Sequence, residues 1–122
     1  MQRRILLIDD DELVLKSVKT LLEKEGYDCL AASSAQEGIG KLEKDGPFEL
    51  ILSDIRMPGK NGVEAAQEIS RLFKDEARKG IPIVFITGYA ELADQLKAEK
   101  LGEVILKPFD NTLLLMTLRE YL

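Results

Sequence analysis

Two apolar runs of this 122-residue sequence are followed by aspartates. Asp9, Asp10 and Asp11 are consecutive, and Asp54 follows a later run. A lone carboxylate between a strand and a helix usually caps the helix, and we expect Asp11 to do so. Two unit charges 4 Å apart repel by roughly 4 kcal/mol at an effective dielectric near 20. Asp9, Asp10 and Asp54 would therefore not lie close together without a cation, so they indicate a cation site.

Carboxylate oxygens with an incomplete protein shell suit Mg²⁺, which keeps several waters and commonly shares its coordination with a phosphate. Thr87 and Lys107 follow two further apolar runs. A metal, a hydroxyl donor and an ammonium around one carboxylate would stabilise the charge of a transferring phosphoryl group. Asp54 is the expected acceptor, and it would form an acyl phosphate.

These side chains need a scaffold that brings four separate segments to one place. Five short apolar runs alternate with segments of helical period. The runs are residues 5–8, 27–32, 48–52, 81–86 and 104–106, and the helical stripes begin at Val14, Ala35, Val63, Leu92 and Leu114. Gly26 is expected to end the first helix, the third runs on through Phe73 and ends by Gly80, and Leu92 and Leu96 mark the fourth. This alternation predicts an α/β fold with a parallel sheet, right-handed crossovers and helices on both faces. Ligands of such sheets bind outside the carboxyl ends of the strands, where the candidate residues lie.

Composition excludes several classes of function. The net charge of −5, from 17 Lys and Arg against 22 Asp and Glu, argues against direct nucleic-acid binding. No apolar run approaches the ~20 residues that a membrane-spanning helix needs, and the N-terminus has no cleavable signal pattern. A single cysteine, Cys29, indicates a reducing compartment, so we expect a cytoplasmic protein without membrane association. The absence of histidine excludes a zinc site or phosphohistidine relay that needs histidine from this chain.

Four segments resemble the response-regulator receiver domain of two-component signalling (CheY-like). They are residues 5–10 (ILLIDD), 50–62 (LILSDIRMPGKNG), 84–88 (VFITG) and 106–109 (LKPF). The resemblance covers essentially the whole chain in the family's order and spacing. It implies a doubly wound, flavodoxin-like fold, with a five-stranded parallel sheet in the order 2-1-3-4-5 and five helices. It also implies that residues 1–122 are a single receiver domain, without an effector domain in this chain.

The same resemblance implies a role for each candidate residue. Asp54 is the phosphoacceptor, and Thr87 and Lys107 bind the phosphoryl group. Mg²⁺ is held by Asp54 and by three further ligands: Asp10 directly, Asp9 largely through metal-bound water, and the main-chain carbonyl of Arg56. The family also commonly has a cis peptide bond at the position of Lys107-Pro108.

One position departs from the family pattern. Val104 stands where the family usually has a Phe or Tyr that changes rotamer as the phosphoryl group draws in the threonine. Valine is stiff and β-branched, and it cannot swing in this way. Tyr89, two residues after Thr87, is the nearest aromatic in sequence. We expect Tyr89 either to supply the missing bulk or to shield the acyl phosphate; the alternative is that it only sits on the surface.

The expected function is a signalling switch rather than an enzyme that turns over a substrate, with self-catalysed phosphotransfer and autodephosphorylation at Asp54. The donor is a histidine kinase or a histidine phosphotransfer protein, and a downstream effector reads the face of the fourth helix, fifth strand and fifth helix. Two alternatives stay open: a haloacid-dehalogenase-type phosphatase with Asp9 as nucleophile and Asp11 beside it, and a degenerate receiver that only docks. A phosphorylation-dependent homodimer is also left open.

Overall fold

The computed structural model describes residues 3–57, 59–72, 81–88 and 92–122, which form five strands that alternate with five helices. The strands are β1 (Arg4–Ile8), β2 (Asp28–Ala32), β3 (Leu50–Asp54), β4 (Ile83–Thr87) and β5 (Glu103–Leu106). The helices are α1 (Glu12–Lys24), α2 (Ala35–Asp45), α3 (Gly62–Leu72), α4 (Leu92–Leu101) and α5 (Asn111–Tyr121). Neighbouring strands pair in parallel in the order β2-β1-β3-β4-β5. This confirms the predicted α/β class, strand order and helix number.

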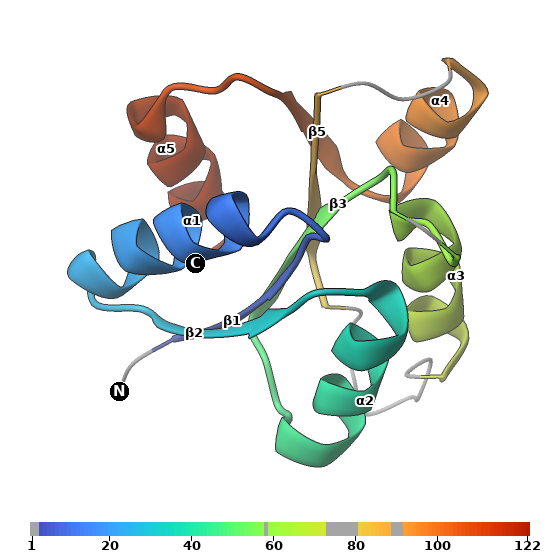
Figure 1. The fold of residues 1–122 in the computed structure, drawn as a ribbon, viewed down its shortest axis with the longest axis horizontal. Helices are drawn as coiled ribbons and strands as arrows, with labels where there is room; N and C mark the ends of the chain where they lie inside the picture. The colour runs from blue at the N-terminus through green and yellow to red at the C-terminus, as the bar shows by residue number, and fades with distance from the viewer. Residues whose placement is uncertain (1–2, 58, 73–80, 89–91) are drawn as a thin grey trace.

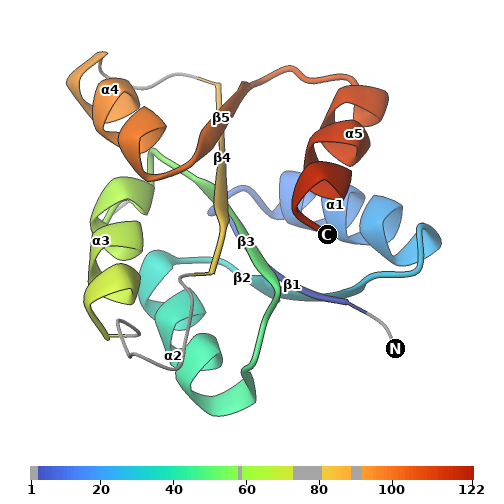
Figure 2. The ribbon, with the colours of Figure 1, turned by 180° about the vertical axis from the view of Figure 1, so that it is seen from behind.

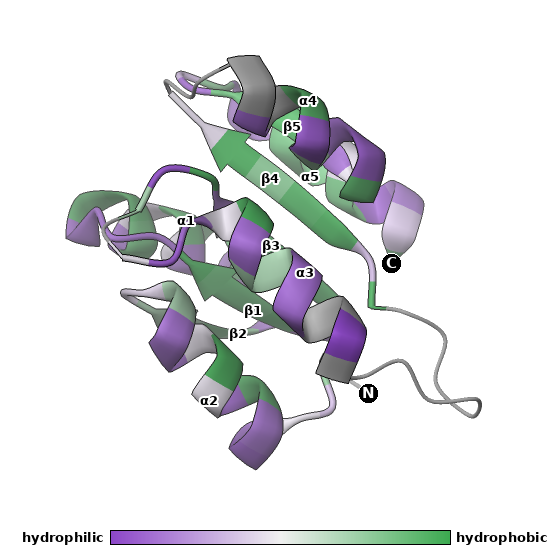
Figure 3. Ribbon diagram, turned by 90° about the vertical axis from the view of Figure 1, so that its right-hand side faces the viewer, coloured by the Kyte–Doolittle hydropathy of each residue, from purple (hydrophilic) through white to green (hydrophobic). Residues whose placement is uncertain are grey.

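The sheet is covered on both faces. Helices α1 and α5 lie on one face, and α2, α3 and α4 lie on the other (Figures 1 and 2). Figure 3 shows apolar strands between helices whose surfaces alternate between polar and apolar residues. Every residue of β3 and β4 is buried, as expected for central strands of a parallel sheet. The sheet thus separates two apolar cores, one around Leu22 and Leu118 and the other around Ile39 and Phe85.

Local signals set the ends of α1 as predicted. The Asp11 side chain accepts hydrogen bonds from the amides of Leu13 and Val14, so Asp11 is the N-cap. Gly26 follows the helix with a φ of 91°, a conformation that favours glycine. None of the helices in the described part of the chain is long and apolar enough to cross a bilayer.

The structure corrects the predicted ends of two strands. β3 and β4 continue through Asp54 and Thr87, which the apolar pattern placed just beyond them. Parallel pairing carries on to these polar residues, with Asp54 opposite Ile86 and Thr87 opposite Leu106. The phosphoacceptor candidate is therefore part of the sheet rather than of the loop that follows it.

The predicted stripe of α4 is wrong in part. Leu96 is 51% exposed, and among the α4 side chains that the structure describes Ala98 packs into the core. The side chain of Leu92, the other predicted stripe residue, lies outside the description. A small alanine suffices at position 98 because Gly102, just after the helix, brings the chain against β4: a Cβ at Gly102 would lie 1.9 Å from the Ile83 carbonyl oxygen. Phe73 and Gly80, which the sequence placed at the end of α3, lie outside the described residues.

Gly62 places the start of α3 directly against the end of β3. Its amide donates to the Ile55 carbonyl at 2.7 Å, and a Cβ at this position would lie 2.0 Å from the Asp54 carbonyl oxygen. Asn61 and Glu64 close the same turn, because each side chain accepts a hydrogen bond from the other residue's amide. Only glycine fits this approach, so the helix and the phosphoacceptor candidate are fixed to one another.

We expect Gly62→Ala to destabilise the protein by about 1–3 kcal/mol, because the added methyl must displace main chain rather than a flexible side chain. Gly40→Ala is the matched control, since nothing lies within 4 Å of a Cβ built at that position in α2. It should stabilise the protein by about 0.5–1 kcal/mol. Urea unfolding of both variants measures the difference, and equal effects would contradict the tight contact.

Candidate functional site

Two neighbouring strands bring the acidic residues together. Asp9 directly follows β1 and Asp54 ends β3, and these strands pair with Ile8 opposite Ser53. The Asp9 amide donates to the Ala32 carbonyl at 3.1 Å, which continues the pairing of β1 with β2 past the strand end. Asp9 is fully buried and Asp54 is nearly so, whereas Asp10 is exposed. The predicted cluster of carboxylates therefore lies at the carboxyl edge of the sheet.

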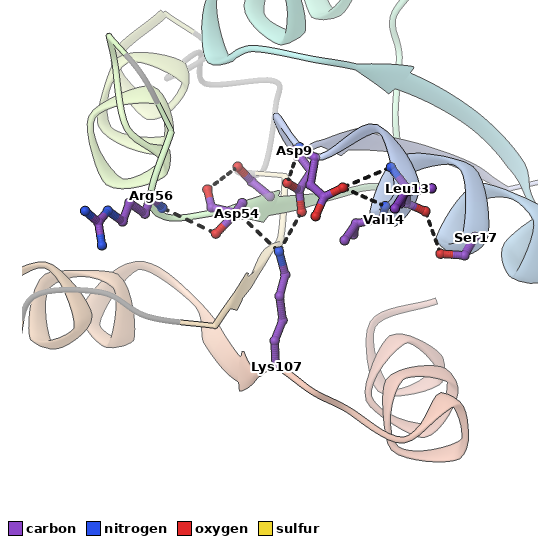
Figure 4. Close-up of polar contacts among 9 residues, drawn as sticks. Asp9, Leu13, Val14, Ser17, Asp54, Arg56 and Lys107 are labelled. Atoms are coloured by element: carbon purple, nitrogen blue, oxygen red, sulfur yellow. Dashed lines mark hydrogen bonds and ion pairs between the residues drawn. The ribbon is translucent and has the colours of Figure 1, made fainter.

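Lys107 reaches from the end of β5 to a position between the two buried carboxylates (Figure 4). Its Nζ lies 2.9 Å from Asp9 Oδ2 and 3.2 Å from Asp54 Oδ2. Its amide donates to the Thr87 carbonyl at 2.7 Å, so its backbone is fixed to β4. The sequence predicted the contact with Asp54, and the structure adds the shorter one with Asp9. The Lys107-Pro108 peptide bond is cis.

The remaining carboxylate oxygens accept main-chain hydrogen bonds. The Asp11 amide donates to Asp9 Oδ1 at 2.9 Å, and the Arg56 amide donates to Asp54 Oδ1 at 3.3 Å. Figure 4 shows both carboxylates pointing toward the Lys107 ammonium. Each buried carboxylate is thus held by one amide and one ammonium, and charge-assisted contacts of this kind fix its orientation.

Burial raises the pKa of Asp54 to about 6, and the nearby charge of Asp9 acts in the same direction. Attraction to Lys107 and the hydrogen bond from the Arg56 amide offset part of this rise. Burial by itself would lower the pKa of Lys107, but its hydrogen bond to Asp9 and the charge of Asp54 outweigh this, so the pKa lies above its ordinary value. At neutral pH Asp54 is therefore an ionised carboxylate beside a permanent ammonium.

The acidic cluster fits a small divalent cation. One carboxylate oxygen each from Asp9, Asp10 and Asp54 lie within 4.8 Å of one another. Three oxygen donors from carboxylates, with one residue exposed and two buried, match the preference of Mg²⁺ for hard ligands and retained water. The contribution of the Arg56 carbonyl to such a site stays a prediction.

Thr87 and Val104, two of the three residues expected to sense a phosphoryl group, lie in the described part of the chain. The Thr87 hydroxyl is buried and has no hydrogen-bond partner among the described residues, which leaves a donor without an acceptor at the strand end. Val104 is half-buried and packs against the core on the α2, α3 and α4 face of the sheet. Tyr89 lies outside the described residues, so its role stays a prediction.

Sequence reasoning missed one polar contact beside the site. The buried Ser53 hydroxyl donates to the Asp54 carbonyl oxygen at 2.9 Å. The same carbonyl oxygen lies so close to Gly62 that there is no room for a Cβ at that position. The Ser53 hydroxyl and Gly62 are thus both next to the Asp54 carbonyl. The available signal was the small polar residue between the end of the apolar run at residue 52 and Asp54.

Comparisons with known proteins agree on one family. A family model described as the response regulator receiver domain matches residues 5–119. Protein PilH of Pseudomonas aeruginosa is 30% identical over 98% of this chain and 97% of its own length. The transcriptional regulatory protein YvrH of Bacillus subtilis is 36% identical over 97% of this chain, which spans only 48% of YvrH. The chain thus spans nearly all of one relative and about half of another.

Solved structures share the fold over almost the full chain. A CheY-like receiver domain protein from Methanospirillum hungatei has a TM-score of 0.87 and 34% identity, and the match covers 98% of this chain and 93% of that one. TrrA of Thermotoga maritima, solved in complex with Mg²⁺ and BeF, has a TM-score of 0.84 and 30% identity. That match covers 99% of this chain and 100% of TrrA.

The raised pKa of Asp54 makes stability depend on pH in a defined direction. The folded protein binds a proton at Asp54 more tightly than the unfolded chain, so this group costs stability as the pH rises from about 4 to about 6. Asp54→Asn should therefore stabilise the metal-free protein at neutral pH, by on the order of 1–3 kcal/mol, and have little effect near pH 4. Urea unfolding in EDTA at both pH values checks this. Asp45→Asn is the control, and a gain from Asp54→Asn that is equal at both pH values would contradict it.

Proposed function

The chain belongs to the response regulator receiver domain family, and from that premise we propose that Asp54 accepts a phosphoryl group from a phosphohistidine on a partner protein. The donor is a histidine kinase or a histidine phosphotransfer protein, as for the family, and its histidine lies on another protein or domain because these 122 residues contain none. The observation that carries the proposal is the placement of Lys107 between Asp9 and Asp54 at the carboxyl edge of the sheet. A cation is thereby held beside one nearly buried, ionised carboxylate.

The proposed reaction transfers the phosphoryl group in one step. An oxygen of the Asp54 carboxylate forms a bond to phosphorus as the bond between phosphorus and the donor histidine nitrogen breaks, and the histidine ring keeps the electron pair. Lys107 neutralises charge on the transferring oxygens, and the Thr87 hydroxyl donates to one of them. That hydroxyl is buried without a partner among the described residues, so a phosphoryl oxygen would supply the acceptor it lacks. Water later hydrolyses the acyl phosphate, which is the autodephosphorylation expected of such a switch.

Asp9, Asp10 and Asp54 would hold Mg²⁺, with the main-chain carbonyl of Arg56 as a further ligand. When bound, this ion supplies charge neutralisation for both the carboxylate cluster and the transferring group. Support comes from the convergence of the three carboxylates and from TrrA, whose structure contains Mg²⁺ with BeF. Lys107 takes part of this neutralising role by itself, since it contacts two of the three carboxylates.

The contacts of Asp9 and Asp11 favour Asp54 over Asp9 as the acceptor, against the phosphatase alternative. Asp9 is fully buried, and its two oxygens accept hydrogen bonds from Lys107 and from the Asp11 amide. Asp11, which would be the second acid of a phosphatase, instead caps α1. Both oxygens of Asp54 also accept hydrogen bonds, from Lys107 and the Arg56 amide, but Asp54 is not fully buried. The difference in exposure, together with the capping role of Asp11, favours Asp54.

Intact-mass measurement after treatment with acetyl phosphate and Mg²⁺ tests the acceptor. We expect one added phosphoryl group on the native protein and on the control variant Asp45→Asn. In both, the label should appear only when Mg²⁺ is present. The label should be absent from Asp54→Asn, and Lys107→Ala should keep the fold but lose transfer or its consequences, since it removes the cation beside the acceptor. A label that persists in Asp54→Asn and maps to Asp9 would favour the phosphatase instead.

The proposed output face is formed by α4, β5 and α5. Three large apolar side chains on β5 and α5 are more than half exposed: Leu106 at 57%, Leu113 at 52% and Met116 at 58%. Exposed apolar side chains on neighbouring elements are candidates for an interaction site. A downstream effector would read this face after phosphorylation, and a homodimer through it is the alternative.

We place the protein in the cytoplasm, as one receiver domain within residues 1–122 that contacts neither nucleic acid nor membrane directly.

Backbone amide shifts with and without beryllofluoride and Mg²⁺ test how the signal reaches this face. Beryllofluoride mimics the acyl phosphate, so the Thr87 hydroxyl should move toward Asp54 and displace the residues after β4. We expect shifts at Thr87, Leu106 and Leu113, whereas Gly26, at the opposite edge of the sheet, stays unchanged. Tyr89→Ala should change the lifetime of the phosphorylated state, and Val104→Ala should cost mainly packing. Shifts confined to residues 54–62 would contradict this route.

A further inference from the structure

β2 is an edge strand, and its outward side is closed by side chains. Its inward side pairs with β1: the Asp28 amide donates to the Arg3 carbonyl at 2.9 Å, and the Ala32 carbonyl accepts from the Asp9 amide at 3.1 Å. Main-chain groups of a strand alternate between its two sides, so those of Cys29 and Ala31 face away from the sheet. An edge of this kind is a template for pairing with another strand.

Two lysines occupy the outward carbonyls of this edge. Lys19 Nζ donates to the Cys29 carbonyl at 3.0 Å, and Lys41 Nζ donates to the Ala31 carbonyl at 2.7 Å. The next outward group, the Ser33 amide, donates to Glu37 Oε2 at 3.2 Å. We call these three side chains, Lys19, Glu37 and Lys41, the edge belt. Together they take the two outward carbonyls of the strand and the outward amide just past its end, but not the outward amides of Cys29 and Ala31.

The belt is assembled from both faces of the sheet. Lys19 comes from α1 and Lys41 and Glu37 come from α2, and Figure 1 shows these helices on opposite sides of β2. Ion pairs along each helix hold the lysines in place: Lys19 Nζ lies 3.9 Å from Glu23 Oε2, and Lys41 Nζ lies 3.8 Å from Glu37 Oε1. A strand that approached the edge would have to displace a side chain on either side of it.

The strand at the other edge of the sheet, β5, differs from β2 in its side-chain contacts. Among the described residues, no side chain donates a hydrogen bond to a main-chain carbonyl of β5. Among the same residues, the Tyr121 hydroxyl donates to the Glu103 carboxylate at 3.2 Å, a contact that does not involve the backbone of the strand. β5 belongs to the proposed output face, so the closed edge lies opposite the face that is expected to bind partners.

We propose that the edge belt closes β2 to pairing with the β2 strand of a second copy. This goes beyond the proposed phosphoryl chemistry and does not depend on it. A second copy is the matching partner because two β2 edges related by a two-fold axis pair antiparallel, and the outward amides and carbonyls of Cys29 and Ala31 then complement one another. The two lysines occupy the carbonyls that this pairing needs, and Glu37 holds the next outward amide, that of Ser33.

The double variant Lys19→Met, Lys41→Met tests the belt, since methionine keeps an unbranched apolar stem and removes the donor. Sedimentation analysis without metal or phosphoryl donor should show self-association at concentrations at least about tenfold lower than for the native protein, because main-chain groups become free to pair. Amide hydrogen exchange should then slow at Cys29 and Ala31, the two amides that face outward.

Lys16→Met, Lys44→Met is the matched control. It removes the same charge from the same two helices, and neither Lys16 nor Lys44 donates a side-chain hydrogen bond to β2. It should remain like the native protein, as should Lys19→Arg, Lys41→Arg, which keeps both donors. Thermal melts check folding, and Lys41→Met alone carries the same prediction at smaller amplitude. Equal association of belt and control variants, or association without slower exchange at Cys29 and Ala31, would overturn the proposal.

Discussion

The candidate site depends on one ammonium between two buried carboxylates. Taking Asp9 and Asp54 out of water next to one another is costly unless a cation compensates, and Lys107 is placed to do so from the far end of the chain. The contact therefore joins β1, β3 and the end of β5 across the edge of the sheet. A change that displaces β5 would also move the Lys107 ammonium away from Asp54. The same contact therefore serves both the strand arrangement and the charge of the site.

Much of this arrangement was predictable from the sequence because its signals are local or periodic. The apolar runs at β1 and β4 are almost continuous, which is typical of strands covered on both faces. Asp11 and Gly26 mark the two ends of α1 through their own side-chain and backbone chemistry. Carboxyl ends of parallel strands meet at one edge, so the convergence of Asp9 and Asp54 followed from the strand assignment alone.

The remaining features depend on contacts between distant parts of the chain. Whether Asp54 lies within β3 or beyond it is decided by pairing with β4, which no local pattern encodes. The exposure of Leu96 follows from the close approach at Gly102, and apolar periodicity cannot detect such an approach. The second contact of Lys107, with Asp9, requires the three-dimensional position of a side chain with four rotatable bonds.

The division of the interior by the sheet has a consequence for how this sequence can diverge. The core under α1 and α5 and the core under α2, α3 and α4 are separated by the backbone of the strands, and the described side chains form two distinct clusters. Substitutions such as one at Leu118 and one at Ile39 should then combine additively, since distant sites without shared neighbours show little epistasis. Each core can therefore accept substitutions independently of the other, whereas residues along the sheet edge are constrained by both cores.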